Sequence, residues 1–219
     1  MSDSSNNQQH AQQNGNVSVD TIVSDIGNTL SSGLSELMAG LLNSAQDRLF
    51  KMSDEADSDK DRARYFELMN QLRILKPAIA ADFNQNIRDF LLPAKEFEEK
   101  QQKKNSPDEE ELSLVDEDDI EGMVLVKNTG ERALSKYQEQ LSQLESRLEH
   151  LALKTDKIFK PENLTPTNIC EAFNNALADN FDNANKKILF SMFDEGVTSR
   201  LETVYDSINN LSLIHISEP

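Results

Sequence analysis

The chain has 219 residues, and its 39 Asp and Glu outnumber its 22 Lys and Arg, which gives a formal net charge of -17 at pH 7. Nucleic-acid binding needs Lys and Arg to displace counterions, and docking on anionic lipid needs basic clusters, so this charge argues against both. Seven Gly, six Pro and no Trp among many Leu, Ala, Glu, Gln and Asn predict a mostly helical protein.

Several features bear on the compartment. The single cysteine, Cys170, excludes an internal disulfide framework and fits a reducing environment. The N-terminus lacks the basic and apolar regions of a signal peptide. The sequence has no run of 18 apolar residues, so we expect no membrane span. We therefore expect a cytoplasmic protein.

The first region is a tail over residues 1–17, rich in Gln, Asn and Ser and without apolar periodicity. Such a composition predicts disorder, and His10 within it is expected to be solvated. A first helix is predicted from Ser18 to Met52, because apolar residues recur along one broad face. Gly33 lies inside this helix and marks either a break or a close approach to a neighbouring helix.

A second helix is predicted to begin at Ser58, with Ser58 as N-cap and Asp61 three residues on as a capping acid. Pro77 predicts a kink or a break, after which the apolar pattern resumes to about residue 103. Pro93 predicts a second kink or the helix end. Residues 18–103 are thus expected to form a helical hairpin region.

Two acidic clusters raise the question of a cation site. One lies in the linker predicted over residues 104–115 and continues to Glu121, and the other spans residues 54–61. The first lacks the alternating ligands, central Gly and closing Glu of an EF-hand loop, and Lys60, Arg62 and Arg64 accompany the second. For the first cluster we favour negative charges that complement the dipole of a helix beginning at Asp116. For the second we favour a solvated loop. We therefore predict no metal site and no cofactor.

The organising element is a long amphipathic helix predicted from Asp116 to Leu153, about 37 residues or roughly 55 Å long. Its apolar stripe follows alternating steps of three and four residues, at Leu134, Tyr137, Leu141, Leu144, Leu148 and Leu151. Going backwards, the same register reaches Met123 and Ile120, with Lys127 and Gly130 interrupting it.

This stripe is also the candidate interaction site, and two arrangements are open. The first packs the stripe against other helices of the same chain, which we favour because several apolar helices are available. The second is a homodimeric coiled coil. The flanking positions carry little complementary charge for such a dimer, at Gln138, Gln140, Glu145 and Arg147.

Two shorter helices complete the region 116–210. Thr165 is the expected N-cap of the first, with Pro166 at the favoured first position. The second is predicted to follow a turn over residues 179–185 and to carry apolar residues from Ile188 to Ile208. Cys170 is expected to be a small core residue, because no basic neighbour lowers its pKa. His150 has no companion at metal-ligand spacing, so we expect a surface or interface histidine.

The last nine residues, 211–219, read LSLIHISEP. They break the helical pattern and resemble the translation of a sequencing adapter. We therefore expect a non-native scar here, His215 in no site, and a chain that is the N-terminal piece of a longer protein.

Several stretches carry a family resemblance. They are LFKMSDEADSDKDRARYFELMNQLR from residue 49, LSLVDEDDIEGMVLVKN from residue 112, LSQLESRLEHL from residue 141, PTNICEAFNNAL from residue 166 and FSMFDEGVTSRLETVYDSIN from residue 190. Together they resemble the bacterial family known as DUF1631. These motifs are helix-surface and core patterns rather than catalytic signatures, so the resemblance says little about mechanism.

The resemblance implies a long cytoplasmic protein of which this chain is the start. Some members are linked to cyclic-di-GMP through a PilZ-like region near the C-terminus, whose Arg-rich turn is absent from this sequence. Others carry the label thymidine phosphorylase. Phosphorolysis needs a phosphate site, and the seven scattered glycines here form no Gly-rich loop.

The expected fold is all-α, an elongated bundle of long amphipathic helices with a coiled-coil-like central helix. The leading expectation for function is a non-enzymatic interaction or regulatory module that binds protein partners or other segments of the same longer chain. The alternative is the helical arm of a cyclic-di-GMP-responsive effector whose nucleotide site lies outside this sequence. An enzyme is the third hypothesis, with its chemistry supplied elsewhere.

Overall fold

The computed structural model describes residues 19–92, 117–153, 161–177 and 180–216, and within these ranges it contains helices and short connections but no strand. The all-α class is therefore confirmed. The elements are α1 (Val19–Asp54), α2 (Asp59–Phe90), α4 (Glu117–Lys136), α5 (Gln138–Ala152), the 3₁₀ helix η1 (Pro161–Leu164), α6 (Pro166–Leu177), α7 (Asn183–Gly196), the 3₁₀ helix η3 (Thr198–Arg200) and α8 (Leu201–Ile216).

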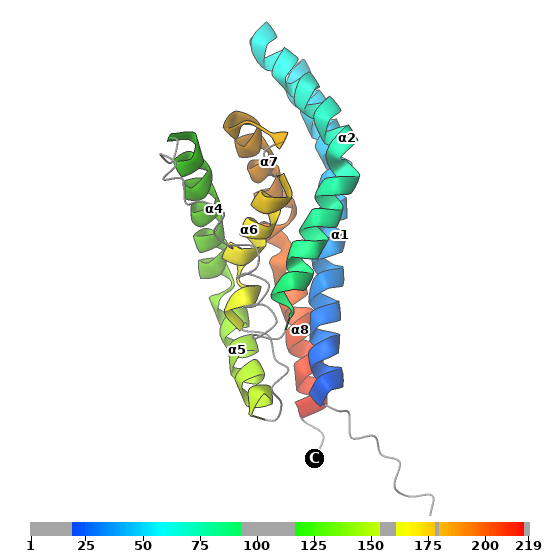
Figure 1. Ribbon diagram of the computed structural model, residues 1–219, viewed down its shortest axis with the longest axis vertical. Helices are drawn as coiled ribbons and strands as arrows, with labels where there is room; N and C mark the ends of the chain where they lie inside the picture. The colour runs from blue at the N-terminus through cyan, green and yellow to red at the C-terminus, as the bar shows by residue number, and fades with distance from the viewer. Residues whose placement is uncertain (1–18, 93–116, 154–160, 178–179, 217–219) are drawn as a thin grey trace, which may run out of the picture.

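The helices form an elongated bundle, as expected (Figure 1). The α1–α2 hairpin lies on one side and α4 with α5 on the other, while α6, α7 and α8 lie between them. The segment predicted to form the central helix, which contains α4 and α5, thus lies at one edge of the bundle. The longest element is instead α1, with 36 residues, which contacts α2, α7 and α8.

The first helix runs without interruption, so of the two alternatives at Gly33 the break is wrong. The buried side of α1 follows the predicted apolar spacing from Ile22 to Leu49. At Gly33 a Cβ atom would lie 3.1 Å from a methyl carbon of Val204. The glycine therefore allows α8 to approach α1 closely.

The turn between α1 and α2 is built as predicted. Ser58 has extended backbone, and its hydroxyl accepts a hydrogen bond from the Asp61 amide at 3.0 Å. The same hydroxyl donates to the Asp61 carboxylate at 2.7 Å. This reciprocal cap satisfies one of the free amides at the start of α2.

The helix α2 continues through Pro77, so of the two alternatives predicted there, a kink or a break, the break is wrong. Proline in a helix interior costs about 3 kcal/mol because it removes one hydrogen bond and crowds the preceding turn. Leu72 and Ile79, on either side of it, are both buried, and this burial holds α2 against its neighbours. The helix ends at Phe90, shortly before Pro93, and residues 93–103 lie outside the described residues.

The predicted single helix over residues 116–153 is two helices. Tyr137 interrupts it with φ -107° and ψ 19°, although the Tyr137 amide still bonds to the Ala133 carbonyl at 3.0 Å. The buried positions before Tyr137 differ from the predicted stripe. In α4 the buried positions are Val126, Thr129, Gly130 and Ala133, whereas Met123, expected on the apolar stripe, is 69% exposed.

The predicted last helix is also two helices, α7 and α8, joined by η3. The break follows Gly196, a residue that favours helix ends. Thr198 then donates its hydroxyl hydrogen to the Asp194 carbonyl at 3.0 Å, which fixes the turn. The apolar positions Phe193, Val197, Leu201 and Val204 remain buried across the break.

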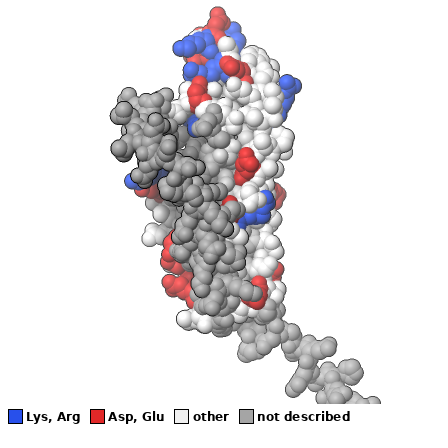
Figure 2. All heavy atoms as spheres, viewed as in Figure 1, with Lys and Arg blue, Asp and Glu red and all other residues white. Residues whose placement is uncertain are grey.

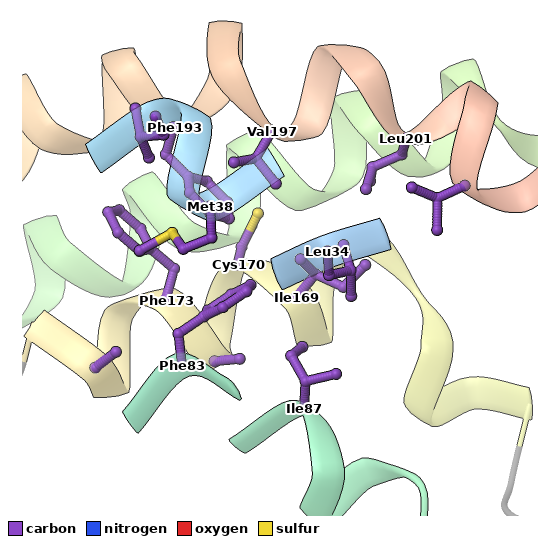
Figure 3. Packing of buried hydrophobic residues seen from close by; sticks show 14 of the residues in the cluster. Leu34, Met38, Phe83, Ile87, Ile169, Cys170, Phe173, Phe193, Val197 and Leu201 are labelled. Atoms are coloured by element: carbon purple, nitrogen blue, oxygen red, sulfur yellow. The ribbon is translucent and has the colours of Figure 1, made fainter. Parts of the chain in front are cut away.

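The core is continuous through the bundle. Figure 3 shows side chains from α1, α2, α6 and the α7–α8 segment converging. Phe173 stacks on Phe193 with ring centroids 4.1 Å apart, and Phe83 meets Phe193 edge to face at 6.2 Å. These aromatic contacts connect α6 and α7 to the hairpin.

The C-terminal end of the described chain differs from the prediction. The helix α8 extends to Ile216, so the predicted break of the helical pattern at Leu211 is wrong. No described helix is long and apolar enough to cross a membrane. The predicted tail over residues 1–17 and the linker over 104–115 lie outside the described residues.

Candidate functional site

The predicted stripe divides into a buried part and a partly open part. Tyr137, Leu144, Leu148 and Leu151 are at most 2% exposed. Leu141 is half-buried, and Leu134 is 37% exposed. The stripe of α5 faces α8 of the same chain. Most of the candidate interaction residues are thus core residues of this fold.

Polar contacts fix α5 on α8. Arg147, predicted to flank a coiled-coil seam, donates to the Asn209 backbone carbonyl at 2.7 Å and to the Asn209 side-chain oxygen at 2.6 Å. The Asn209 side-chain amide donates in turn to the Gln140 carbonyl at 3.0 Å. Because Asn209 is 4% exposed, these bonds satisfy polar groups that burial would otherwise leave unpaired.

A second set of contacts ties α4 to the α7–α8 joint. Arg132 pairs with Asp194 at 2.9 Å, and Lys136 donates to the Ser199 carbonyl at 2.9 Å. Asp194 also accepts a short hydrogen bond from Thr198. The charged side chains near the break after Gly196 therefore hold α4 against the α7–α8 joint.

The two open members of the stripe, Leu134 and Leu141, line a shallow groove of about 510 Å³. Glu145, Glu162 and Thr165 complete its walls. Thr165 precedes α6, and its carbonyl accepts the first helical bond from Ile169 at 3.1 Å, which confirms the predicted start of this helix at Pro166.

Cys170 is buried in the core among aromatic side chains (Figure 3). Burial, and to a lesser extent the nearby carboxylates of Asp194 and Glu171, raises the pKa of its thiol to about 12. A thiol with such a pKa is protonated at neutral pH and is a poor nucleophile. This agrees with the prediction of a core cysteine. Burial also raises the pKa of Tyr205, whose hydroxyl donates to the Leu164 carbonyl at 2.8 Å.

The acidic cluster over residues 54–61 lies at the tip of the hairpin, where Figure 2 shows both signs of charge gathered. Asp59 pairs with Arg62 at 3.1 Å, and Glu55 lies 3.8 Å from Lys51. Within the described ranges, no group of three or more His, Cys, Asp and Glu side chains is placed to hold a metal ion. His150 is exposed on α5, while His10 and the acidic linker lie outside those ranges.

A groove lies between α1 and α8, at a place that the sequence did not single out. It has a volume of about 810 Å³ and is called the α1–α8 groove below. Its walls carry small residues, among them Gly33, Gly40 and Gly196, and its floor is Leu37, Leu41 and Val204. The only sequence signal was the seven-residue spacing from Gly33 to Gly40, because Gly196 comes from a distant segment.

Charged residues line the same groove. Arg48 and Glu195 form an ion pair at 2.8 Å across one end of it. Glu36 and Arg200 are exposed along it. The groove thus combines an apolar floor, walls formed by small residues, and charges of both signs at its rim.

One family model matches the chain. The family model described as "Protein of unknown function (DUF1631) N-terminal domain" matches residues 18–215. No curated protein and no solved structure matches the chain. The match covers all the described helices except the last residue of α8. The chain therefore belongs to the DUF1631 family and contains its N-terminal domain.

Proposed function

We infer that this chain is a non-catalytic interaction module of a cytoplasmic protein and that it binds an amphipathic helix in the α1–α8 groove. The observation that carries the proposal is the groove itself, about 810 Å³ in volume and lined by α1 on one side and by residues 195–207 of the α7–α8 segment on the other. Its lining runs along α1 from Thr29 to Arg48, which corresponds to roughly 29 Å or about five helical turns.

The lining suggests the chemistry of the bound helix. At Gly40 nothing lies within 4 Å of the place where a Cβ would stand, so this part of the wall is open. Large apolar side chains of a partner would fit between the small wall residues and cover Leu37. Acidic groups would suit Arg200, and basic groups would suit Glu36. The partner would be another protein or another segment of a longer chain.

The test uses the burial of Cys170, which leaves an introduced cysteine as the reactive thiol. A photo-crosslinker is attached at Gly40→Cys in the groove or at Ala39→Cys, an exposed residue of α1 outside the groove lining. Each chain is irradiated in a lysate of the organism that encodes it, and crosslinked peptides are sequenced. We expect one defined helical segment to crosslink at position 40 and not at position 39.

A synthetic peptide of the captured segment then tests specificity. Gly40→Phe fills the groove, whereas Ala39→Phe adds the same ring beside it. We expect the peptide to bind the wild type and Ala39→Phe, and to lose at least about ten-fold in affinity for Gly40→Phe. Equal binding to all three chains, or the absence of a crosslink specific to position 40, would contradict the proposal.

A further inference from the structure

A second surface lies on the hairpin, on the side of α2 that points away from the bundle. Ile74, Pro77, Ala78 and Ala81 are all exposed there, and Ile74 is 72% exposed. Their spacing of three, one and three residues places them on one strip of the helix. We call this strip and its two polar ends the α2 face.

The α2 face is self-complementary about a point between Pro77 and Ala78. Ile74 and Ala81 lie equally far from this point, as do Asn70 and Gln85 farther out. At the ends, Glu67 and Arg88 form the matching pair and carry opposite charges. All of these side chains are exposed. An antiparallel copy of α2 would therefore set apolar residues against apolar ones, amide against amide, and Glu67 against Arg88 at both ends.

The two end groups, Glu67 and Arg88, are exposed and within reach of a partner. Within the described residues, Glu67 takes part in no ion pair. Arg88 donates to Gln85 at 2.9 Å, a bond between two residues of the α2 face itself. Glu67 and Arg88 are 21 residues apart, or roughly 32 Å along the helix. Because the Glu67 and Arg88 side chains are long, they can still meet where the axes of the two helices move slightly apart.

Charge distinguishes a second copy from other partners. The whole chain carries -17, so two copies repel each other across most of their surfaces. The helix α2, in contrast, has six Lys and Arg against five Asp and Glu. It is a surface on which two copies meet without net repulsion. Together with the two-fold pattern, this favours the same chain as the occupant.

We propose that the α2 face mediates a two-fold homodimer in which α2 packs antiparallel on α2 of a second copy, with Glu67 of each copy against Arg88 of the other. The contact involves one helix from each copy. Stable complexes generally bury about 1,200 Å² or more. A single helix pair buries less, so the dimer is weak and dissociates on dilution. The α1–α8 groove is formed by other helices and stays open in this dimer.

Sedimentation equilibrium of the 219-residue chain over a range of concentrations tests the proposal. We expect the average mass to rise from monomer toward dimer, and Ile74→Glu to remain monomeric throughout. Because Ile74 is exposed, circular dichroism should show an unchanged helical signal in this variant. Met123→Glu changes an exposed residue on α4 and serves as the control, with wild-type association expected.

Charge reversal tests the antiparallel register without changing the apolar strip. We expect Glu67→Arg alone and Arg88→Glu alone each to weaken association by about ten-fold, because each places like charges at both ends. The double variant Glu67→Arg/Arg88→Glu should regain the wild-type dissociation constant. A wild type that stays monomeric at every concentration, an Ile74→Glu chain that dimerises normally, or a double variant no better than the single ones would overturn the proposal.

Discussion

Gly130 of α4 lies directly against Thr167 of α6. A Cβ added at Gly130 would stand 2.6 Å from the Thr167 Cα and 2.8 Å from its hydroxyl oxygen. Backbone atoms cannot yield as a flexible side chain can, so only glycine fits here. The residue that interrupted the predicted apolar stripe is therefore the one that lets these two helices meet.

Gly130→Ala should destabilise the fold. Alanine gains about 1 kcal/mol in helix propensity over glycine, but overpacking against a backbone typically costs 1–3 kcal/mol or more. We expect a net loss of about 1–2 kcal/mol in urea denaturation. Gly40→Ala is the matched control, because a Cβ there meets nothing within 4 Å, and it should stabilise. Equal midpoints for the two variants would refute the close packing of α4 on α6.

Ser58→Ala should remove the cap of α2. The hydroxyl of Ser58 holds the Asp61 amide at 3.0 Å, and losing such a cap costs about 1 kcal/mol. Ser58→Asp keeps an oxygen that can accept this bond and should retain most of the stability. Thermal denaturation of the two variants measures the difference. If both lose the same stability, the cap does not contribute as the structure implies.

Arg147→Met should loosen α5 from α8. The substitution keeps much of the apolar stem but leaves the buried oxygens of Asn209 without their donor. Hydrogen bonds to charged groups contribute about 1.5–3 kcal/mol, and we expect a loss in this range. Glu145→Gln, on the exposed side of the same helix, should change the free energy of unfolding by less than about 0.5 kcal/mol.

The pKa of Cys170 predicts how stability changes in alkali. The thiol titrates near 9.0 when unfolded and near 12 when folded, so the folded state disfavours the thiolate. Its contribution to stability is complete below pH 9 and is lost as the pH rises from 9 toward 12. Between these values the wild type should lose up to about 1.4 kcal/mol per pH unit more than Cys170→Ala.

Urea denaturation at several values from pH 7 to pH 10.5 measures this difference. The gap between wild type and Cys170→Ala should be constant below pH 9 and should change above it. Curves that stay parallel to pH 10.5 would show that the thiol is not as buried as the structure places it.

Local signals in the sequence predicted local structure well. Ser58 with Asp61, and Thr165 with Pro166, act within a single turn, and both helix starts are where the residues indicated. The long apolar side of α1 was equally easy to predict, because the spacing of its apolar residues persists for ten turns of one helix. The all-α class follows from the same regularity.

Features that depend on distant contacts were missed. The spacing alone favoured Leu134 as a buried residue, but Ala133 is buried in its place. The break after Gly196 was hidden because apolar positions continue at helical spacing through η3. The α1–α8 groove depends on α1 and the α7–α8 segment coming together, which no local pattern of either shows.

The central claim is that the leucine stripe of α5 belongs to the interior, which leaves the α1–α8 groove and the α2 face to meet partners. Urea denaturation of Leu148→Ala against Leu134→Ala, followed by circular dichroism, tests it most directly. Leu148 is fully buried and should lose about 2–5 kcal/mol, whereas Leu134, 37% exposed, should lose about 1 kcal/mol or less. A Leu148→Ala chain as stable as Leu134→Ala would contradict the claim and return the stripe to the surface as a partner site.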